Sequence, residues 1–492
     1  MCLTWTCCFV LFPLFCLTPG HAKTYQAHIK EKFSNLWFQE ARTRIHEYLD
    51  QENARKEQES LQRLFVDFLA LCYCLYEMRN EDFVQWAMDF FQAVKLSIID
   101  DADLVVSAYC LKHCSGLRTL WVSALHDFEE EDEEGSTAIH WNQVCSALIT
   151  NENLREFRMS DSSLHGFTFV TLCDQLKHPR CRLQKLHLNN VSFPRGSRLF
   201  FEVLTHSPHL KCLNLSGTKL SRNAVKLLCE ALNNPTCNIE ELLLARCWLS
   251  VEDCSAFSQI LRSSRKLLNL NVSRNYLVPG APLLCKVLCK PDCALRVLDL
   301  GHCYLDQHCW TNLYEVLLCN KSLIHLDLTS NILKDKKLKL LCEALKEPGC
   351  HLRSLILKCL ITAAGCRELA SVLPVNPNLR NLQLGYNDIE DTGVKLLCEG
   401  LTHPSCRLEI LGWVSCPQSH GSNQRLLPGY LFCPHQQQNS EDFESGWKCL
   451  GPQWDGGALR GPEAPRVHPA GSQVSRQLLP WGKGLVLGLR KG

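Results

Sequence analysis

Apolar residues return along residues 154–411 with a period close to 28 residues. The two clearest copies run from Leu295 to Leu305 and from Leu323 to Leu333, with leucine at relative positions 1, 4, 6 and 11 and Cys or Asn at position 9. Ten copies begin at Leu154, Leu183, Leu210, Ile239, Leu267, Leu295, Leu323, Leu352, Leu379 and Leu408. The alternation within the first six positions predicts a short strand that buries its leucines on one face.

Cysteines keep the same period between the expected strands. One series, Cys173, Cys229, Cys285, Cys342 and Cys398, is spaced by 56, 56, 57 and 56 residues. A second series, in Pro-x-Cys, ends at Cys181, Cys237, Cys293, Cys350 and Cys406. Near-identical stretches, such as Lys226–Leu232 and Lys339–Leu345, predict one helix with a single apolar face in each repeat.

The strand pattern is the leucine-rich-repeat signature. A unit of one strand and one helix cannot bury its apolar face alone, so neighbouring units stack and share a core. Helices are wider than the spacing of strands, so the stack should curve with the sheet inside. The sequence therefore predicts an α/β fold, a leucine-rich-repeat solenoid shaped like a horseshoe, preceded by a helical block.

The repeats resemble two known groups of proteins. Units of 28 and 29 residues with cysteine in both helix and turn are similar to the ribonuclease-inhibitor type. The phrases Leu-Leu-Cys-Glu-Ala-Leu and Pro-x-Cys resemble the C-terminal repeats of NOD-like receptors of the pyrin-containing subfamily, over roughly residues 60–411. This second resemblance implies the regulatory repeat region of an innate-immune receptor, and the helical block before the repeats favours it over an inhibitor.

We expect four regions along the chain. Residues 1–27 form a signal-like or atypical leader, and residues 28–116 form a helical cap similar to the segment that precedes the repeats in these receptors. Residues 117–411 contain the repeats, with a first strand at Leu117–Val122, and residues 412–492 have the Gly- and Pro-rich composition of disorder. A strand at Leu408 that no repeat follows should leave a weakly covered sheet edge, and the chain is expected to be a truncated form.

Two local features interrupt the array. The acidic run Glu129–Glu134 separates the first two strands and is interpreted as a solvated loop, with a docking site for a basic partner as the alternative. In the repeat that begins at Leu352, Cys359 arrives one residue early. A one-residue deletion in that turn should shift the backbone locally without breaking the stack.

Composition excludes several kinds of function. The formal charge is +1, so no global field favours nucleic acid, and no membrane-spanning stretch is expected. No Gly-x-x-x-x-Gly-Lys-(Ser/Thr), His-Glu-x-x-His or Gly-x-Ser-x-Gly occurs, so we expect neither catalysis nor a cofactor. The run Cys285, Cys289, Cys293 resembles metal-ligand spacing, but two of its members belong to the repeat series and no metal site is expected.

The 31 cysteines bear on the compartment. Many recur at equivalent positions, which favours buried free thiols and a reducing, cytoplasmic environment. The alternative is secretion through residues 1–22, whose apolar stretch suits a signal peptide but lacks a preceding Lys or Arg. Asn214 and Asn271 head glycosylation triplets, yet they fall on the predicted sheet, where a glycan would crowd the concave face.

Candidate binding residues fall into two groups. One residue after the Cys or Asn of the turn stand Trp248, Tyr276 and Tyr304, which should line up at one rim of the array. Polar residues between the last two strand leucines should face solvent on the concave side, namely Arg158, His187, Asn214, Asn271, Asp299, Asp327 and Gln383. Clustered aromatic groups beside polar ones are common interface anchors, although they could also pack on one another and stiffen the rim.

These features favour a non-catalytic scaffold that binds proteins, including full-length receptors of the same family. The alternatives are a ribonuclease-inhibitor-like binder and a secreted leucine-rich-repeat protein.

Overall fold

The computed structural model describes residues 68–89, 91–124, 136–164, 166–192, 198–278, 280–290, 292–413, 429–432 and 448–449. They divide into two compact units, and the boundary falls between Phe157 and Arg158, inside strand β3 (Glu156–Ser160). The expected leader and the acidic run Glu129–Glu134 lie outside the described residues, as does most of the expected tail.

The first unit contains four helices and two complete strands among its described residues. They are α3 (Phe68–Met78), α4 (Glu81–Asp89), β1 (Ala93–Ile98), α5 (Asp101–Lys112), β2 (Thr119–Ala124) and α6 (Ser136–Thr150). Asp100 caps α5, where its side chain accepts a hydrogen bond from the backbone N–H of Asp103.

Strand β1 corrects the prediction of a wholly helical block. It pairs in parallel with β2, in the register Val94↔Leu120 and Leu96↔Val122. Val94, Leu96 and Ile98 are buried while the residues between them are half-buried, so this short segment follows the two-residue period of a strand. Parallel strand pairing therefore begins before the strand expected at Leu117.

The second unit is a stack of repeats in two layers. Its strands are β4 (Lys185–Asn189), β5 (Cys212–Asn214), β6 (Glu241–Leu243), β7 (Asn269–Asn271), β8 (Val297–Asp299), β9 (His325–Asp327), β10 (Ser354–Ile356), β11 (Asn381–Gln383), β12 (Ile410–Trp413), β13 (Gly429–Phe432) and β14 (Lys448–Cys449). Its helices are α7 (Gly166–Lys177), α8 (Arg198–His206), α9 (Arg222–Leu232), α10 (Val251–Ser263), α11 (Ala281–Leu288), α12 (Gln307–Cys319), α13 (Lys334–Lys346), α14 (Ala363–Val372) and α15 (Glu390–Leu401).

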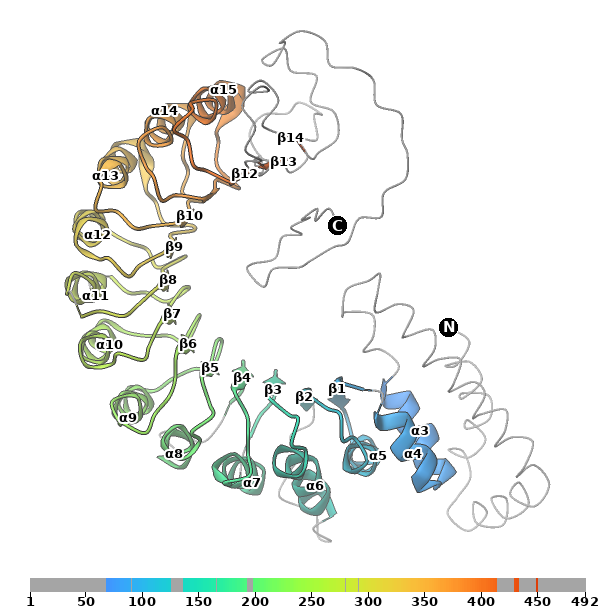
Figure 1. The fold of residues 1–492 in the computed structure, drawn as a ribbon. Helices are drawn as coiled ribbons and strands as arrows, with labels where there is room; N and C mark the ends of the chain where they lie inside the picture. Colours follow the sequence, from blue (N-terminus) through green and yellow to red (C-terminus); the bar gives the residue numbers. More distant parts are fainter. Residues whose placement is uncertain are drawn as a thin grey trace, which may run out of the picture. The chain divides into compact units, whose positions relative to one another are not determined.

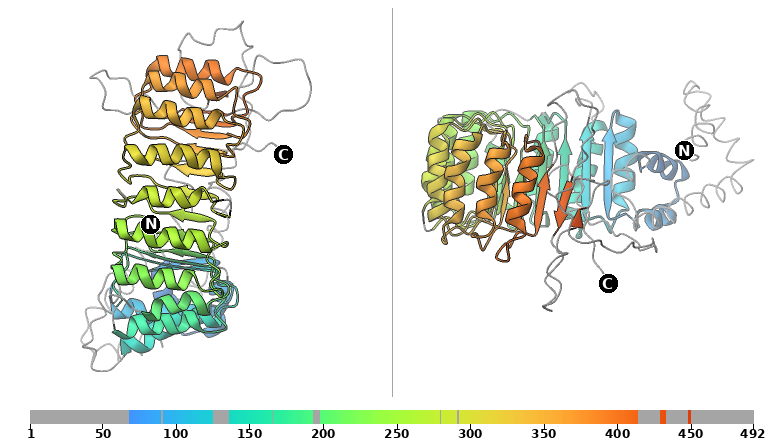
Figure 2. Two further views of the ribbon diagram at one scale, coloured as in Figure 1. Left: turned by 90° about the vertical axis from the view of Figure 1, so that its left-hand side faces the viewer. Right: turned by 90° about the horizontal axis from the view of Figure 1, so that it is seen from above.

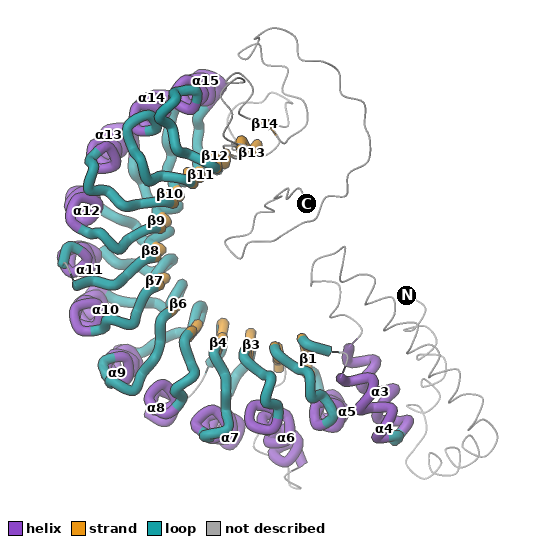
Figure 3. The backbone as a smooth tube through the Cα atoms, in the orientation of Figure 1, coloured by secondary structure: helices purple, strands orange, loops and turns teal. Residues whose placement is uncertain are grey.

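Strands β4 to β12 pair in parallel, each with the strand of the next repeat. Within this unit the strands line the inner side of the stack and the helices form its outer layer (Figure 1). The helices run side by side in one layer (Figure 2). One loop connects each strand to the helix that follows it, and another connects that helix to the next strand (Figure 3). This confirms the predicted leucine-rich-repeat solenoid. None of the helices in the described residues is both long and apolar enough to span a bilayer.

The core of the stack is built from columns of equivalent side chains. Leu270, Leu298 and Leu326 occupy matching registers on neighbouring strands, and each is at most 1% exposed. The helix cysteines join these columns: Cys173, Cys229, Cys285 and Cys342 are buried free thiols, and Cys398 is half-buried. Burial raises the pKa of the Cys285 and Cys342 thiols. This confirms the prediction that the repeated cysteines fill core positions.

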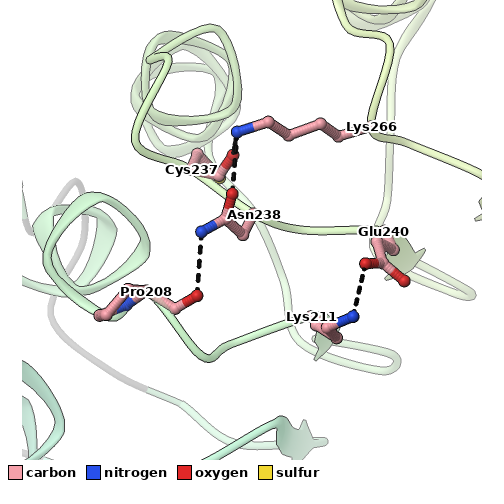
Figure 4. Close-up of polar contacts among 6 residues, drawn as sticks. All are labelled: Pro208, Lys211, Cys237, Asn238, Glu240 and Lys266. Carbon is pink, nitrogen blue, oxygen red and sulfur yellow. Dashed lines mark hydrogen bonds and ion pairs between the residues drawn. The ribbon is translucent and has the colours of Figure 1, made fainter.

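Polar contacts outside the sheet also join successive repeats (Figure 4). The ammonium Nζ of Lys266 donates to the carbonyl oxygen of Cys237 and to Oδ1 of Asn238, both at 2.8 Å. Asn238 in turn donates from Nδ2 to the carbonyl oxygen of Pro208 at 2.9 Å. Three repeats are thereby linked through one asparagine.

The shortened repeat keeps its place in the stack. The N–H of Leu328 donates to the carbonyl oxygen of Ile356 at 3.0 Å, and that of Ser330 donates to Lys358 at 2.7 Å. Cys359 reaches back to the preceding repeat, where its Sγ donates to the carbonyl oxygen of Leu328 at 3.0 Å. The prediction that the missing residue would not break the stack is confirmed.

The edge strand of the stack is paired. Strand β12 pairs antiparallel with β13, in the register Leu411↔Leu431, and β13 pairs antiparallel with β14. The expectation of a weakly covered edge at Leu408 is therefore wrong. The expected disorder of residues 412–492 stays a prediction, because most of these residues lie outside the described ranges. An open edge offers unpaired N–H and C=O groups to any nearby extended segment, and such pairing needs no repeat periodicity.

Candidate functional site

The loops that follow the strands carry a row of exposed large side chains. Trp248 is 55% exposed, Tyr276 64% and Tyr304 69%, and they come from three successive repeats. Ile332 and Leu360 continue the row at the equivalent position of the next two repeats and are 59% and 64% exposed. We call these five residues the rim row.

The backbone of the rim row is held by asparagines of the following repeats. Asn275 accepts at Oδ1 from the N–H groups of Cys247 and Leu249, at 2.9 and 3.1 Å, and these two residues flank Trp248. Its Nδ2 donates to the carbonyl oxygens of Leu244 and Val272, at 2.8 and 2.9 Å. One buried side chain thus sets the path of the chain on both sides of Trp248.

The same arrangement returns every second repeat. Asn331 accepts from the N–H groups of Cys303 and Leu305, which flank Tyr304. Asn387 accepts from the N–H groups that flank Leu360, those of Cys359 and Ile361. The Asn and Cys turns are therefore complementary halves of a unit of two repeats, which explains why the two residues alternate along the sequence.

Three members of the rim row have a backbone conformation that is costly for bulky residues. Trp248, Tyr304 and Leu360 have positive φ angles of 56°, 57° and 60° respectively. A left-handed backbone at a non-glycine residue costs about 1 kcal/mol or more and is often found at functional positions. Large side chains are thus presented to solvent where glycine or asparagine would fit more easily, which points to a role outside the core.

The rim side chains contact one another without being buried. The rings of Tyr276 and Tyr304 lie 5.7 Å apart between centroids, tilted by 49°. The guanidinium Cζ of Arg246 lies 6.0 Å from the centre of the Trp248 ring. Because the three aromatic groups remain more than half exposed, these contacts do not replace the burial that a partner would provide.

Basic side chains accompany the rim row. Arg246 and Arg274 are exposed in the same loops, and the ammonium of Lys358 lies 5.1 Å from the centre of the exposed Tyr386 ring. Within the described part of the chain, Arg246, Arg274 and Lys358 form no ion pair with a carboxylate. We call these three residues the rim cations. Together with burial, Arg274 and Lys358 lower the pKa of the nearby His302.

The predicted concave-face residues lie on the strands. Arg158 is exposed on β3, and His187 on β4 is half-buried beside Asn214, with 3.2 Å between His187 Nδ1 and Asn214 Nδ2. The 2.7 Å hydrogen bond from Asn271 Nδ2 to Asp299 Oδ2 continues this polar surface. Gln383 is half-buried on β11.

Asp299 and Asp327 are paired across neighbouring strands. Burial, followed by the like charge of Asp327, raises the pKa of Asp299 to about 6. Each carboxylate also accepts a backbone N–H, from Gly301 and Thr329 respectively, both at 2.8 Å. Among the described residues, Asp299 is the carboxyl group of the concave face whose pKa is raised toward neutrality.

Replacing Asp327 with asparagine is expected to stabilise the second unit at pH 7.5 by about 1 kcal/mol, because it removes the like charge beside Asp299. The pKa of Asp299 is raised in the folded protein, so the folded state holds this proton more tightly than the unfolded state. Stability from this group is therefore greatest below pH 4 and is lost as the pH rises to about 6. In thermal melts from pH 4 to 8, the melting temperature should fall less in the variant than in the unaltered chain. An unchanged pH dependence would contradict the electrostatic coupling of Asp299 with Asp327.

Sequence reasoning missed several residues of this surface. Ile332 and Leu360 occupy the repeat position of Trp248, Tyr276 and Tyr304. They were missed because only aromatic residues were considered at that position. Each rim cation stands two residues before a member of the rim row, so a search of the same turns for basic residues would have found all three. The structure brings Tyr276 and Tyr304 together, and it places Arg158 and His187 on strands well before the repeats that carry the rim row.

Comparison with known proteins gives clear relatives by sequence. The chain is 40% identical over 412 residues to NACHT, LRR and PYD domains-containing protein 4E of Mus musculus, covering 83% of this chain and 42% of the relative. It is 37% identical over 376 residues to protein 9 of the same series from Bos taurus, covering 75% of this chain and 38% of the relative. The chain thus spans less than half the length of these curated relatives.

No protein-family model matches the chain. Among solved structures, a leucine-rich repeat-containing protein from Legionella pneumophila is similar, with a TM-score of 0.41 and 16% sequence identity, covering 62% of this chain and 97% of that protein.

Proposed function

Since this chain is a homologue of the NACHT, LRR and PYD domains-containing proteins, we propose that it is a non-catalytic scaffold that binds other proteins through its leucine-rich repeats. The proposed setting is innate immunity, in the cytoplasm, and the proposed partner is a full-length receptor of the same family. The observation that carries the proposal is the rim row, in which five successive repeats each expose a large apolar side chain by more than half.

Physical chemistry supports the rim row as the contact surface. Trp and Tyr are enriched among the residues that dominate binding energies at protein interfaces, and they act best when a partner excludes water from them. The rim row supplies such groups on backbones fixed by buried asparagines. Little side-chain or loop ordering would then be needed on binding, which favours affinity.

The rim cations indicate the chemistry of the partner segment. Arg246, Arg274 and Lys358 have no carboxylate partner among the described residues, and they flank the apolar row. A protein segment that carries acidic side chains next to apolar ones would complement both features. The concave polar residues, including Arg158, His187, Asp299 and Asp327, are proposed as a secondary contact region.

Two observations support a cytoplasmic setting over secretion. Asn214 is 8% exposed, and the Nδ2 atoms of both Asn214 and Asn271 hydrogen-bond within the sheet face, to His187 and Asp299. A glycan on either nitrogen would replace these contacts. Repeated cysteines such as Cys229, Cys285 and Cys342 are buried free thiols, as a reducing compartment would keep them.

Reversing charge at Arg274 and Lys358 together, as Arg274→Glu and Lys358→Glu, is expected to weaken binding to a purified full-length receptor of this family by about tenfold or more. The matched control is Arg222→Glu with Lys226→Glu on helix α9, which changes net charge equally on the outer layer. Biolayer interferometry with the full chain, repeated at rising salt concentration, measures the affinity of both double variants. Equal loss of affinity in the two double variants would refute the rim row as the contact surface. No binding by the unaltered chain would refute this partner.

A further inference from the structure

Two cysteines of the second unit, Cys289 and Cys319, belong to neither the helix series nor the Pro-x-Cys series. Cys285 and Cys293 belong to the helix and Pro-x-Cys series, but Cys289 lies between them without a counterpart in the other repeats. Cys319, the last residue of α12, is likewise absent from both series. The packing argument that explains the repeated cysteines therefore does not explain these two.

Their exposure also differs from that of the repeated cysteines. Most cysteines in the described ranges are buried, whereas Cys319 is exposed and Cys289 is half-buried. Reactivity of a thiol toward oxidants requires access as well as ionisation. Cys319 meets the first requirement better than the other described cysteines do.

The two thiols lie at the ends of neighbouring helices. Cys289 caps the C-terminal end of α11, and its thiol is close enough to that of Cys319, the last residue of α12, for the two side chains to interact electrostatically. The residues next to them are joined as well: Asn320 donates from Nδ2 to the carbonyl oxygen of Leu288 at 2.7 Å. Asn320 is 4% exposed, so this buried contact holds the ends of the two helices together.

We propose that Cys289 and Cys319 are a peroxide-oxidisable thiol pair, which closes to a disulfide and links two neighbouring repeats. The Cys319 thiolate attacks hydrogen peroxide, the O–O bond breaks, and a sulfenic acid and water are formed after proton uptake. The Cys289 sulfur then attacks the sulfenic sulfur, the S–O bond breaks, and hydroxide leaves with the thiol proton as water. In total, two thiols and one hydrogen peroxide give one disulfide and two waters.

The surroundings of Cys289 assign the order of the steps. Burial first, and then the adjacent Cys319 and Glu315, raise the pKa of Cys289 to about 11. Cys289 is therefore protonated at neutral pH and reacts slowly with peroxide itself, so the exposed Cys319 meets the oxidant first and the neighbouring Cys289 takes the second, resolving step. Glu315→Gln is expected to speed closure of the disulfide, because it removes a negative charge that disfavours the Cys289 thiolate.

The test is peptide mapping of the full chain after treatment with hydrogen peroxide under native conditions, with remaining free thiols alkylated before digestion. The expected product is a Cys289–Cys319 cross-linked peptide, about 2 Da lighter than its two reduced halves because two hydrogens are lost. Cys319→Ser should abolish it, and Cys406→Ser, at another half-buried thiol, should leave it unchanged.

A second readout keeps the test independent of peptide recovery. Oxidised chain should melt at a higher temperature than reduced chain, and the difference should vanish in Cys319→Ser and in Cys289→Ser. Accumulation of sulfinic acid at Cys319 without the cross-link, or cross-links from Cys319 to other cysteines, would overturn the proposal. Receptor binding by the rim row is not needed for either readout.

Discussion

Asn331→Ala is expected to lower the free energy of unfolding of the repeat stack by about 4 kcal/mol, because it leaves several buried backbone groups without partners. The Asn331 side chain accepts from the N–H groups of Cys303 and Leu305 and donates to the carbonyl oxygens of Leu300 and Leu328. It is 1% exposed, so bulk water does not reach these groups in the folded protein. Each unpaired buried group costs roughly 1–3 kcal/mol.

Urea unfolding followed by circular dichroism measures this effect. The control is Asn234→Ala, because Asn234 is exposed and its side chain bonds only to the nearby Thr236 within its own turn. That change should alter stability by less than about 0.5 kcal/mol. Asn275→Ala and Asn387→Ala should resemble Asn331→Ala, since their hydrogen bonds are equivalent. A loss for Asn331→Ala no larger than that of the control would contradict the assigned role.

Trp248→Ala combined with Tyr304→Ala is expected to weaken binding to a full-length receptor of the family by about 100-fold or more, because truncation of an interface anchor typically costs 2 kcal/mol or more. The melting temperature should change little, since the two side chains are 55% and 69% exposed and fill no core space. Alanine at these positions keeps the backbone and its asparagine contacts, so only the presented surface is lost.

The binding measurement needs a control of similar exposure away from the rim row. Val170→Ala with Val375→Ala serves, because these side chains are 45% and 54% exposed in the same unit. This pair should leave affinity within about twofold of the unaltered chain. If the rim double variant instead unfolds at lower temperature, the rim aromatics act mainly by packing on one another. If it melts normally and binds normally, the contact surface lies elsewhere in the stack.

The two predictions separate structure from function on the same loop. The Asn331 side chain accepts hydrogen bonds from the backbone N–H groups of the two residues that flank Tyr304. Losing Asn331 should impair both folding and binding, whereas losing the Tyr304 ring should impair binding alone. Comparing the stability and the affinity of the two variants therefore tests whether Asn331 fixes the loop and Tyr304 makes the contact with the partner.

The sequence by itself determined the architecture of the stack. Each repeat contacts mainly its neighbours, so a local pattern of leucines with a constant period is sufficient to predict strand, turn and helix. Leu298 and Leu326 are buried in matching registers as that pattern requires, and the cysteines of the helix series fill equivalent core positions. The shift of Cys359 was also readable, because a period makes a single missing residue visible.

Only the tertiary structure decided the contacts that arise between repeats. The strand Ala93–Ile98 is too short for its alternation to stand out from the surrounding helical pattern, and parallel pairing with β2 defines it. Pairing of Gly429–Phe432 with β12 likewise depends on an open edge and on no periodic signal. The proximity of Cys289 to Cys319 depends on where two helices of different length end, a property that neither repeat contains alone.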